Sequence, residues 1–92
     1  MLKNYLDNLA SVFPIVWDRF VGPDNGQYCI YGWIERTDGK RDFVVIFAMN
    51  DNDNWEIGMV TSSAKYSAKM SEYITNTKNN HLVCQKYEDL NV

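Results

Sequence analysis

The residues best suited to bind a ligand are basic and hydroxyl side chains gathered in two short segments. The first surrounds an Asp38-Gly39 turn, and the second opens a predicted helix in which two lysines stand four residues apart. Free N–H groups at a helix start favour anions, and serine hydroxyls add donors there. We therefore expect a binding surface for a phosphate or an acidic protein patch, formed by Arg36, Lys40, Arg41, Ser62, Ser63, Lys65 and Lys69.

Patterns for catalysis are short and isolated in this chain. Ser62 and Lys65 match S-x-x-K, in which a neutral lysine can activate a serine, but the other motifs of that enzyme class are absent. Helix capping accounts fully for Ser62 and Ser63. His81, the one histidine, has no Ser, Cys or Asp partner that spacing identifies. We predict no catalytic residues.

Metal and cofactor ligands do not occur at a spacing that binds an ion. The polar segment Asn50–Asn54 fails as a calcium loop, because neither register supplies a glycine at position six and an acid at position twelve. One histidine and two distant cysteines, Cys29 and Cys84, cannot complete a structural zinc site. The glycines form no phosphate-binding loop. We expect no metal, no cofactor and two reduced cysteines that act as small apolar side chains.

One pair of carboxylates resembles that of restriction-endonuclease-like nucleases. These enzymes place an Asp and then a (D/E)-x-K tripeptide on neighbouring strands within an α-β-β-β-α-β order. Asp42 and Glu56 match the two acids, and the resemblance implies a shared Mg²⁺ ion. Gly58 stands where the lysine belongs, so the group that would orient water or stabilise charge is missing. A degenerate domain of this class is therefore the weakest of three interpretations.

Composition limits the class of protein. The chain has 92 residues, a formal charge of −3, 46% apolar residues and 14% aromatic residues. The charge is too small for a DNA mimic and has the wrong sign for a bulk binder of nucleic acid. No apolar run approaches the roughly 20 residues that cross a bilayer, and the start lacks a signal peptide. We expect one soluble cytoplasmic domain spanning residues 1–92.

Hydrophobic periodicity predicts an α+β fold with the order α-β-β-β-β-α-β. An apolar stripe at helical spacing runs from Leu2 to Phe13, and Pro14 ends that helix. The pattern of Ile15–Val21 indicates a short strand or a second helical turn, before the turn residues 22–26. A meander follows over residues 27–60, then a helix near Tyr66–Thr77 and a last strand at Leu82–Tyr87.

The hairpin at Thr37–Lys40 has two candidate registers. A two-residue loop would oppose Glu35 and Asp42, an unfavourable pair of like charges. A three-residue loop with a left-handed Gly39 opposes Glu35 and Arg41, and we prefer it.

Both faces of the meander carry large apolar side chains. We expect Trp33, Phe43, Val45 and Phe47 to be mostly buried. The other face, with Ile30, Ile34, Val44 and Ile46, must then be covered by the two helices or by a second subunit, because so large an apolar patch is unusual on a monomer. We favour a homodimer.

These observations favour a small non-enzymatic protein-interaction module. Its length, asparagine content and absent motifs are typical of accessory and inhibitor proteins of phages and viruses, a comparison of composition alone. The alternative is a nucleic-acid-binding module that uses the local basic patch with nearby Tyr or Trp rings for stacking. Either way, the expected partner is another macromolecule and not a membrane.

Overall fold

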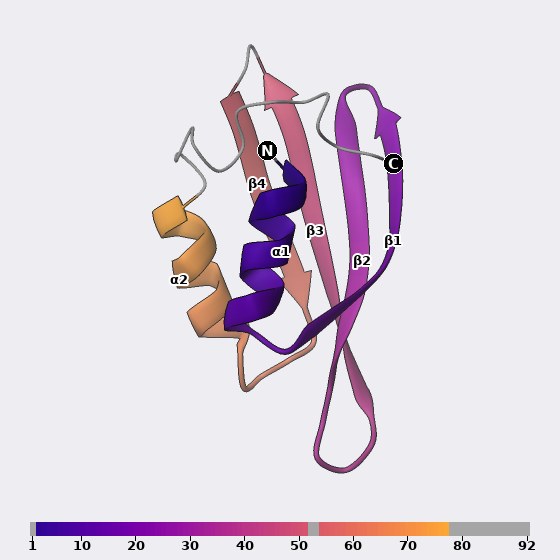
Figure 1. The fold of residues 1–92 in the computed structure, drawn as a ribbon, viewed down its shortest axis with the longest axis vertical. Coiled ribbons are helices and arrows are strands. Elements are labelled where there is room, and N and C mark those ends of the chain that lie inside the picture. Colours follow the sequence, from indigo (N-terminus) through magenta and orange to yellow (C-terminus); the bar gives the residue numbers. More distant parts are fainter. Residues whose placement is uncertain (1, 52–53, 78–92) are drawn as a thin grey trace.

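The computed structural model describes residues 2–51 and 54–77, which form two helices and one four-stranded antiparallel sheet (Figure 1). In chain order the elements are α1 (Leu2–Val12), β1 (Ile15–Asp24), β2 (Gln27–Glu35), β3 (Arg41–Asp51), β4 (Asn54–Thr61) and α2 (Ser67–Thr77). This confirms the predicted α+β order through the second helix. The predicted last strand, Leu82–Tyr87, lies outside the described residues.

The sheet is a meander in which every strand pairs with its neighbour in sequence, in the order β1-β2-β3-β4. Asn25 and Gly26 connect β1 to β2, and both have positive φ angles, 52° and 80°. A two-residue turn with two positive φ angles matches the right-handed twist of a hairpin, which explains the Asn-Gly pair. The segment after Pro14 pairs with β2 from Ile15 onward, so it is a strand and not a second helical turn.

The β2–β3 hairpin has the register that the like-charge argument predicts. Glu35 pairs with Arg41, and the Arg36 N–H donates to the Lys40 carbonyl at 2.7 Å. Three residues, Thr37, Asp38 and Gly39, remain in the loop, and Gly39 has a φ of 84°. The three-residue loop with a left-handed glycine is confirmed. This hairpin extends past the ends of both helices (Figure 1).

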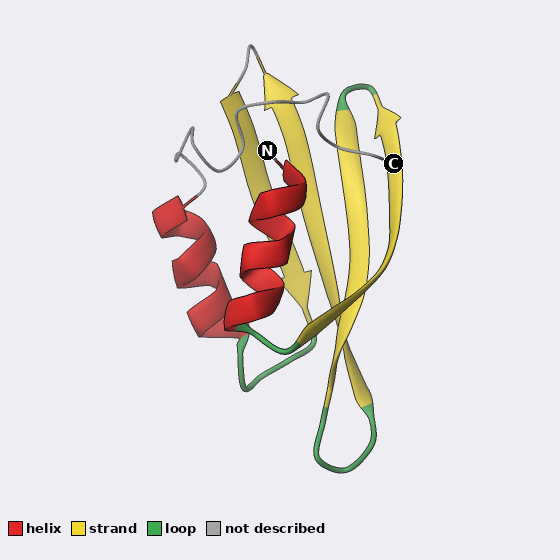
Figure 2. Ribbon diagram, viewed as in Figure 1, coloured by secondary structure: helices red, strands yellow, loops and turns green. Residues whose placement is uncertain are grey.

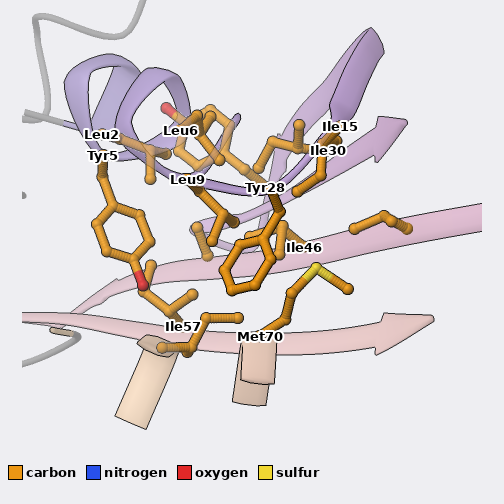
Figure 3. Close-up of a cluster of buried hydrophobic side chains, with 14 of the residues drawn as sticks. Leu2, Tyr5, Leu6, Leu9, Ile15, Tyr28, Ile30, Ile46, Ile57 and Met70 are labelled. Carbon is orange, nitrogen blue, oxygen red and sulfur yellow. The ribbon is translucent and has the colours of Figure 1, made fainter. Parts of the chain in front are cut away.

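Both helices lie on the same face of the sheet (Figure 2). Leu2, Tyr5, Leu6 and Leu9 of α1 are buried, as the apolar stripe predicts. Figure 3 shows these side chains directed at the sheet, where they meet buried residues of the strands and of α2. The strand and α2 contributions are Ile15, Tyr28, Ile30, Ile34, Val44, Ile46, Ala48, Trp55, Ile57, Met70 and Ile74.

Hydrogen bonds and ring contacts fix the two helices against the sheet and each other. The Trp17 indole Nε1–H donates to the Leu6 carbonyl at 3.0 Å, which ties β1 to α1. The Tyr5 and Thr77 hydroxyls are 2.9 Å apart, which ties α1 to the end of α2. Phe13 meets the Tyr73 ring edge to face at 5.9 Å. The helix layer is thus a packed unit on one side of the sheet.

The expected burial over the two sheet faces is met only in part: the helices cover one face, which was one of the two alternatives, but Phe43 on the other face is exposed. The predicted interior side chain Phe43 is 49% exposed, and Trp33, Val45 and Phe47 are only half-buried. The set Ile30, Ile34, Val44 and Ile46 forms the interior instead. The helices cover this second set, so no second subunit is needed there. No described helix or loop covers the face that bears Trp33 and Phe43.

Two strand glycines give a matched test of this packing. A Cβ at Gly32 would lie 2.6 Å from the Val16 carbonyl oxygen and 2.8 Å from Trp17 Cε3, beside a β-bulge at Asp18. A Cβ at Gly58 would meet nothing closer than Phe47 Cβ at 3.9 Å. We predict that Gly32→Ala lowers the free energy of unfolding by about 1–3 kcal/mol, because backbone must move.

The control, Gly58→Ala, should leave that free energy unchanged or raise it by less than about 1 kcal/mol, because it restricts the unfolded chain. Urea unfolding of the two variants and the wild type measures both effects. Equal losses in both variants would contradict the close approach at Gly32.

Candidate functional site

The predicted basic surface is divided in the structure. Four of its members, Arg36, Ser62, Ser63 and Lys65, line one cavity of about 390 Å³ between the β2–β3 hairpin and the turn that leads into α2. The hairpin strand and the residues after β4 meet there because Ser62 extends the β3–β4 pairing, with its N–H donating to the Phe43 carbonyl at 3.2 Å. The hairpin and the turn that leads into α2 therefore lie side by side at this cavity.

Acidic side chains balance the charge of this cavity. Asp42 and Glu35 line it together with Arg36 and Lys65. Arg36 Nε lies 3.9 Å from Asp42 Oδ2 and 3.5 Å from Asp38 Oδ1. Two cations facing two carboxylates leave no net positive charge for a phosphate. These ion pairs favour a role for the cavity residues in fixing the β2–β3 hairpin over a role in binding an anion.

The two serines in the cavity have structural partners. The Phe43 N–H donates to Ser62 Oγ at 3.0 Å, and Ser62 Oγ donates to Asp42 Oδ1 at 3.2 Å. Ser63, which is 2% exposed, accepts a hydrogen bond at Oγ from the Tyr66 N–H at 3.3 Å. Lys65 Nζ lies 5.3 Å from the centre of the Tyr66 ring. Ser63 thus has the predicted capping geometry. Ser62 connects the start of β3 to the residues after β4 through its hydrogen bonds with Asp42 and Phe43.

The remaining predicted cations lie elsewhere. Lys69 borders a separate hollow with Phe13 and Tyr73, on the helix side of the molecule. The Lys40 N–H closes the hairpin loop by donating to Asp38 Oδ1 at 2.9 Å. Arg41 belongs to the opposite side of the sheet, where its guanidinium lies 4.3 Å from the centre of the Trp33 ring.

The two carboxylates of the nuclease resemblance are far apart. Asp42 pairs with Ile34 near the start of β3, whereas Glu56 pairs with Met49 near its end. Seven residues of strand separate these levels, roughly 24 Å at 3.4 Å per residue. The alternation of the strand also directs the two acids to opposite faces. They cannot bind the same Mg²⁺ ion.

Within residues 2–51 and 54–77, no group of three or more His, Cys, Asp and Glu side chains is placed to hold a metal ion. Neither described helix is long and apolar enough to cross a membrane.

One side of the sheet has no described helix or loop over it, and we call this side the open face. Strand alternation and pairing register assign its side chains to all four strands. Its members are Val16, Arg19, Val21, Gln27, Cys29, Tyr31, Trp33, Glu35, Arg41, Phe43, Val45, Phe47, Met49, Glu56, Gly58 and Val60. Most are apolar or aromatic.

Arginines cover two of the aromatic rings on the open face. Arg41 lies over Trp33, and Arg19 lies over Tyr31 with its Cζ 4.9 Å from the ring centre. Such cation–π contacts orient a guanidinium while leaving its N–H groups free to reach a partner. Glu35, opposite Arg41, and Glu56, at the other end of the face, are exposed. The face therefore has an apolar centre and a mixed-charge border.

A hollow that Gly58 helps to line lies at one end of the open face. A space of about 390 Å³ is bordered there by Phe47, Met49, Gln27 and Glu56, among others. Gly58 pairs with Phe47 across the strands, and its missing side chain leaves the flank of that ring accessible. Phe43, toward the opposite end of β3, is 49% exposed. The open face thus carries both an exposed ring and a recess.

Sequence reasoning missed the open face, although the sequence contains a signal for it. In β2 and β3 the charged residues Glu35 and Arg41 share the alternation of Trp33 and Phe43, and not that of the interior isoleucines. Charged side chains at the same parity mark the solvent side of a strand. The count identifies the face correctly in β2, where Glu35 is the one charged residue, but is split in β3, because Asp42 has the parity of the interior residues.

No protein-family model, no curated protein and no solved structure matches this chain. Its function is therefore inferred from the geometry of the chain itself.

The structural role of Ser63 can be tested directly. We predict that Ser63→Ala lowers the free energy of unfolding by about 1 kcal/mol, because the Tyr66 N–H loses its side-chain acceptor. Ser71→Ala is the matched control, since Ser71 is exposed within α2 and alanine is the best helix former. It should change the free energy by a few tenths of a kcal/mol at most. Urea unfolding measures both, and equal effects would exclude the capping role.

Proposed function

We propose that this chain is a small non-enzymatic protein-interaction module and that its open face is the docking surface. The observation that carries the proposal is the uncovered row of Trp33, Phe43, Val45 and Phe47 on the side of the sheet away from the helices. Large contiguous apolar patches mark interaction sites in soluble proteins. An accessory or inhibitor protein would act by placing this surface on its target.

The composition of the open face supports a protein partner. Protein interfaces are enriched in aromatic residues, Met and Arg at their centres and have polar rims. Tyr31 and Trp33 with their stacked arginines match the first feature, and Glu35 and Glu56 match the second. Aromatic and Arg side chains are also the commonest sources of binding energy in alanine scans.

The nucleic-acid alternative has less support from the same surface. Stacked aromatic rings with arginines are typical of single-strand binding surfaces. Such surfaces also need positive charge along the backbone path, but the open face carries Glu35, which pairs with Arg41, and Glu56 as well as its two arginines. Lys65 and Lys69, which were expected to extend the basic patch, lie toward the helix side. A protein partner therefore remains the better proposal.

The docking surface can be tested with a photoreactive side chain. Val60 on the open face is 50% exposed, and Val12 at the end of α1 is 55% exposed, so the two positions are matched in residue type and exposure. We predict that benzoylphenylalanine at position 60, in cells that carry this protein, cross-links to a discrete protein species. The same group at position 12 should not, because it lies in the helix layer.

A second pair of variants provides an independent measurement. Val60→Ser should weaken capture of the cross-linked species, whereas Val12→Ser should not, with unfolding midpoints recorded for both. Equal cross-linking at the two positions, or binding insensitive to Val60→Ser, would exclude the open face as the docking surface.

A further inference from the structure

The open face is complementary to itself. The β3 strand places its features symmetrically about Val45: Phe43 lies two residues before it, and the Phe47–Gly58 pair lies two residues after it. Four residues before Val45 is Arg41, and four after it is the Met49–Glu56 pair. An exposed ring and a recess, and a cation and an anion, thus lie at equal distances along the strand from Val45.

We infer that the open face binds a second copy of this chain, face to face, with the strands of the two copies running in opposite directions. The inference rests on the proposed function and names the partner that covers the docking surface. A two-fold axis across the strands at Val45 brings Phe43 of each copy to the level of the Gly58 recess in the other. It also brings Arg41 to the level of Glu56 of the second copy.

The geometry of packed sheets permits this match. Phe43 and Gly58 lie on neighbouring strands, about 4.8 Å apart in the sheet plane. Two packed sheets are rotated by roughly 30° relative to each other. Phe43 and Gly58 lie two residues along their strands from the axis, and at that distance the rotation displaces a group sideways by a few ångströms. Arg19 lies at the level of the axis on the edge strand β1, so the axis brings the Arg19 side chains of the two copies toward each other at that edge, where each is stacked on Tyr31 and exposed to solvent.

The size of the open face suits a dimer. Four strands span roughly 19 Å, and nine residues of β3 span roughly 27 Å, so the face covers roughly 500 Å² in projection. Two copies would bury about 1,000 Å² or more, which reaches the lower bound for a specific interface. Two-fold contacts use the same patch on both subunits, as a self-complementary face requires.

Charge reversal at Arg41 and Glu56 tests the contact and its orientation. In Arg41→Glu alone, every contact would set the introduced glutamate against Glu56, and in Glu56→Arg alone, the introduced arginine would face Arg41. We predict that the wild type sediments as a dimer at tens of micromolar and that each single variant weakens the dimer by about tenfold or more. An equimolar mixture of the two variants should restore dimers. In a heterodimer one contact is the native Arg41–Glu56 pair and the other is the same pair with its charges exchanged, so no like-charge contact remains.

The outcomes separate this inference from the proposed function. Dimeric wild type together with recovery in the mixture supports the second copy as partner, with urea midpoints confirming that both variants fold. A monomeric wild type, or a mixture no more dimeric than its components, would overturn it. If the wild type is monomeric and position 60 still cross-links to a different protein, the inference fails while the proposed docking surface stands.

Discussion

The structure depends on a simple constraint: a β-strand directs successive side chains to opposite faces, and the described helices cover one of those faces. In β2 and β3 both faces carry large apolar groups. Helices α1 and α2 pack on the isoleucine side, where Ile30 and Ile46 meet Leu6 and Met70 in one core. Everything on the other parity, from Trp33 to Phe47, is left with no described element to pack against. The folding core and the proposed binding surface are thus the two sides of the same strands.

The partition between the two faces has a physical rationale. In β2 and β3 the interior residues Ile30, Ile34, Val44 and Ile46 are aliphatic, so they fill space against leucine side chains. Tyr28 and Trp55 are polar-tipped strand residues of the same core. The open face holds Tyr31 and Trp33, whose hydroxyl and indole N–H groups reach water or a partner more readily there. It also holds Arg19 and Arg41, whose charges would be costly to bury unpaired. Among the described strands, the helices therefore cover the face that bears no arginine.

Local chemistry in the sequence predicted most of the fold. The α1 stripe, the end at Pro14 and the three-residue loop at Thr37–Gly39 all follow from interactions within a few residues, and the structure confirms each. The choice of sheet face did not follow, because it depends on contacts between helices and strands distant in sequence. The structure brings together only part of the predicted basic patch. Arg36 and Lys65 line the same cavity, but Arg41 lies on the opposite side of the sheet, because strand alternation directs its side chain there although it is close to Arg36 in sequence.

At Gly58 the shape of the open face can change without a loss of fold stability, although in most proteins these two properties change together. A side chain at this position would contact only Phe47 at ordinary van der Waals distance, so folding does not require a glycine there. The depth of the recess on the open face nevertheless depends on it. Most substitutions that change the shape of a binding surface also change the free energy of unfolding, which limits the substitutions that selection retains. Here the shape of the surface can evolve one methyl group at a time while the folded chain stays intact.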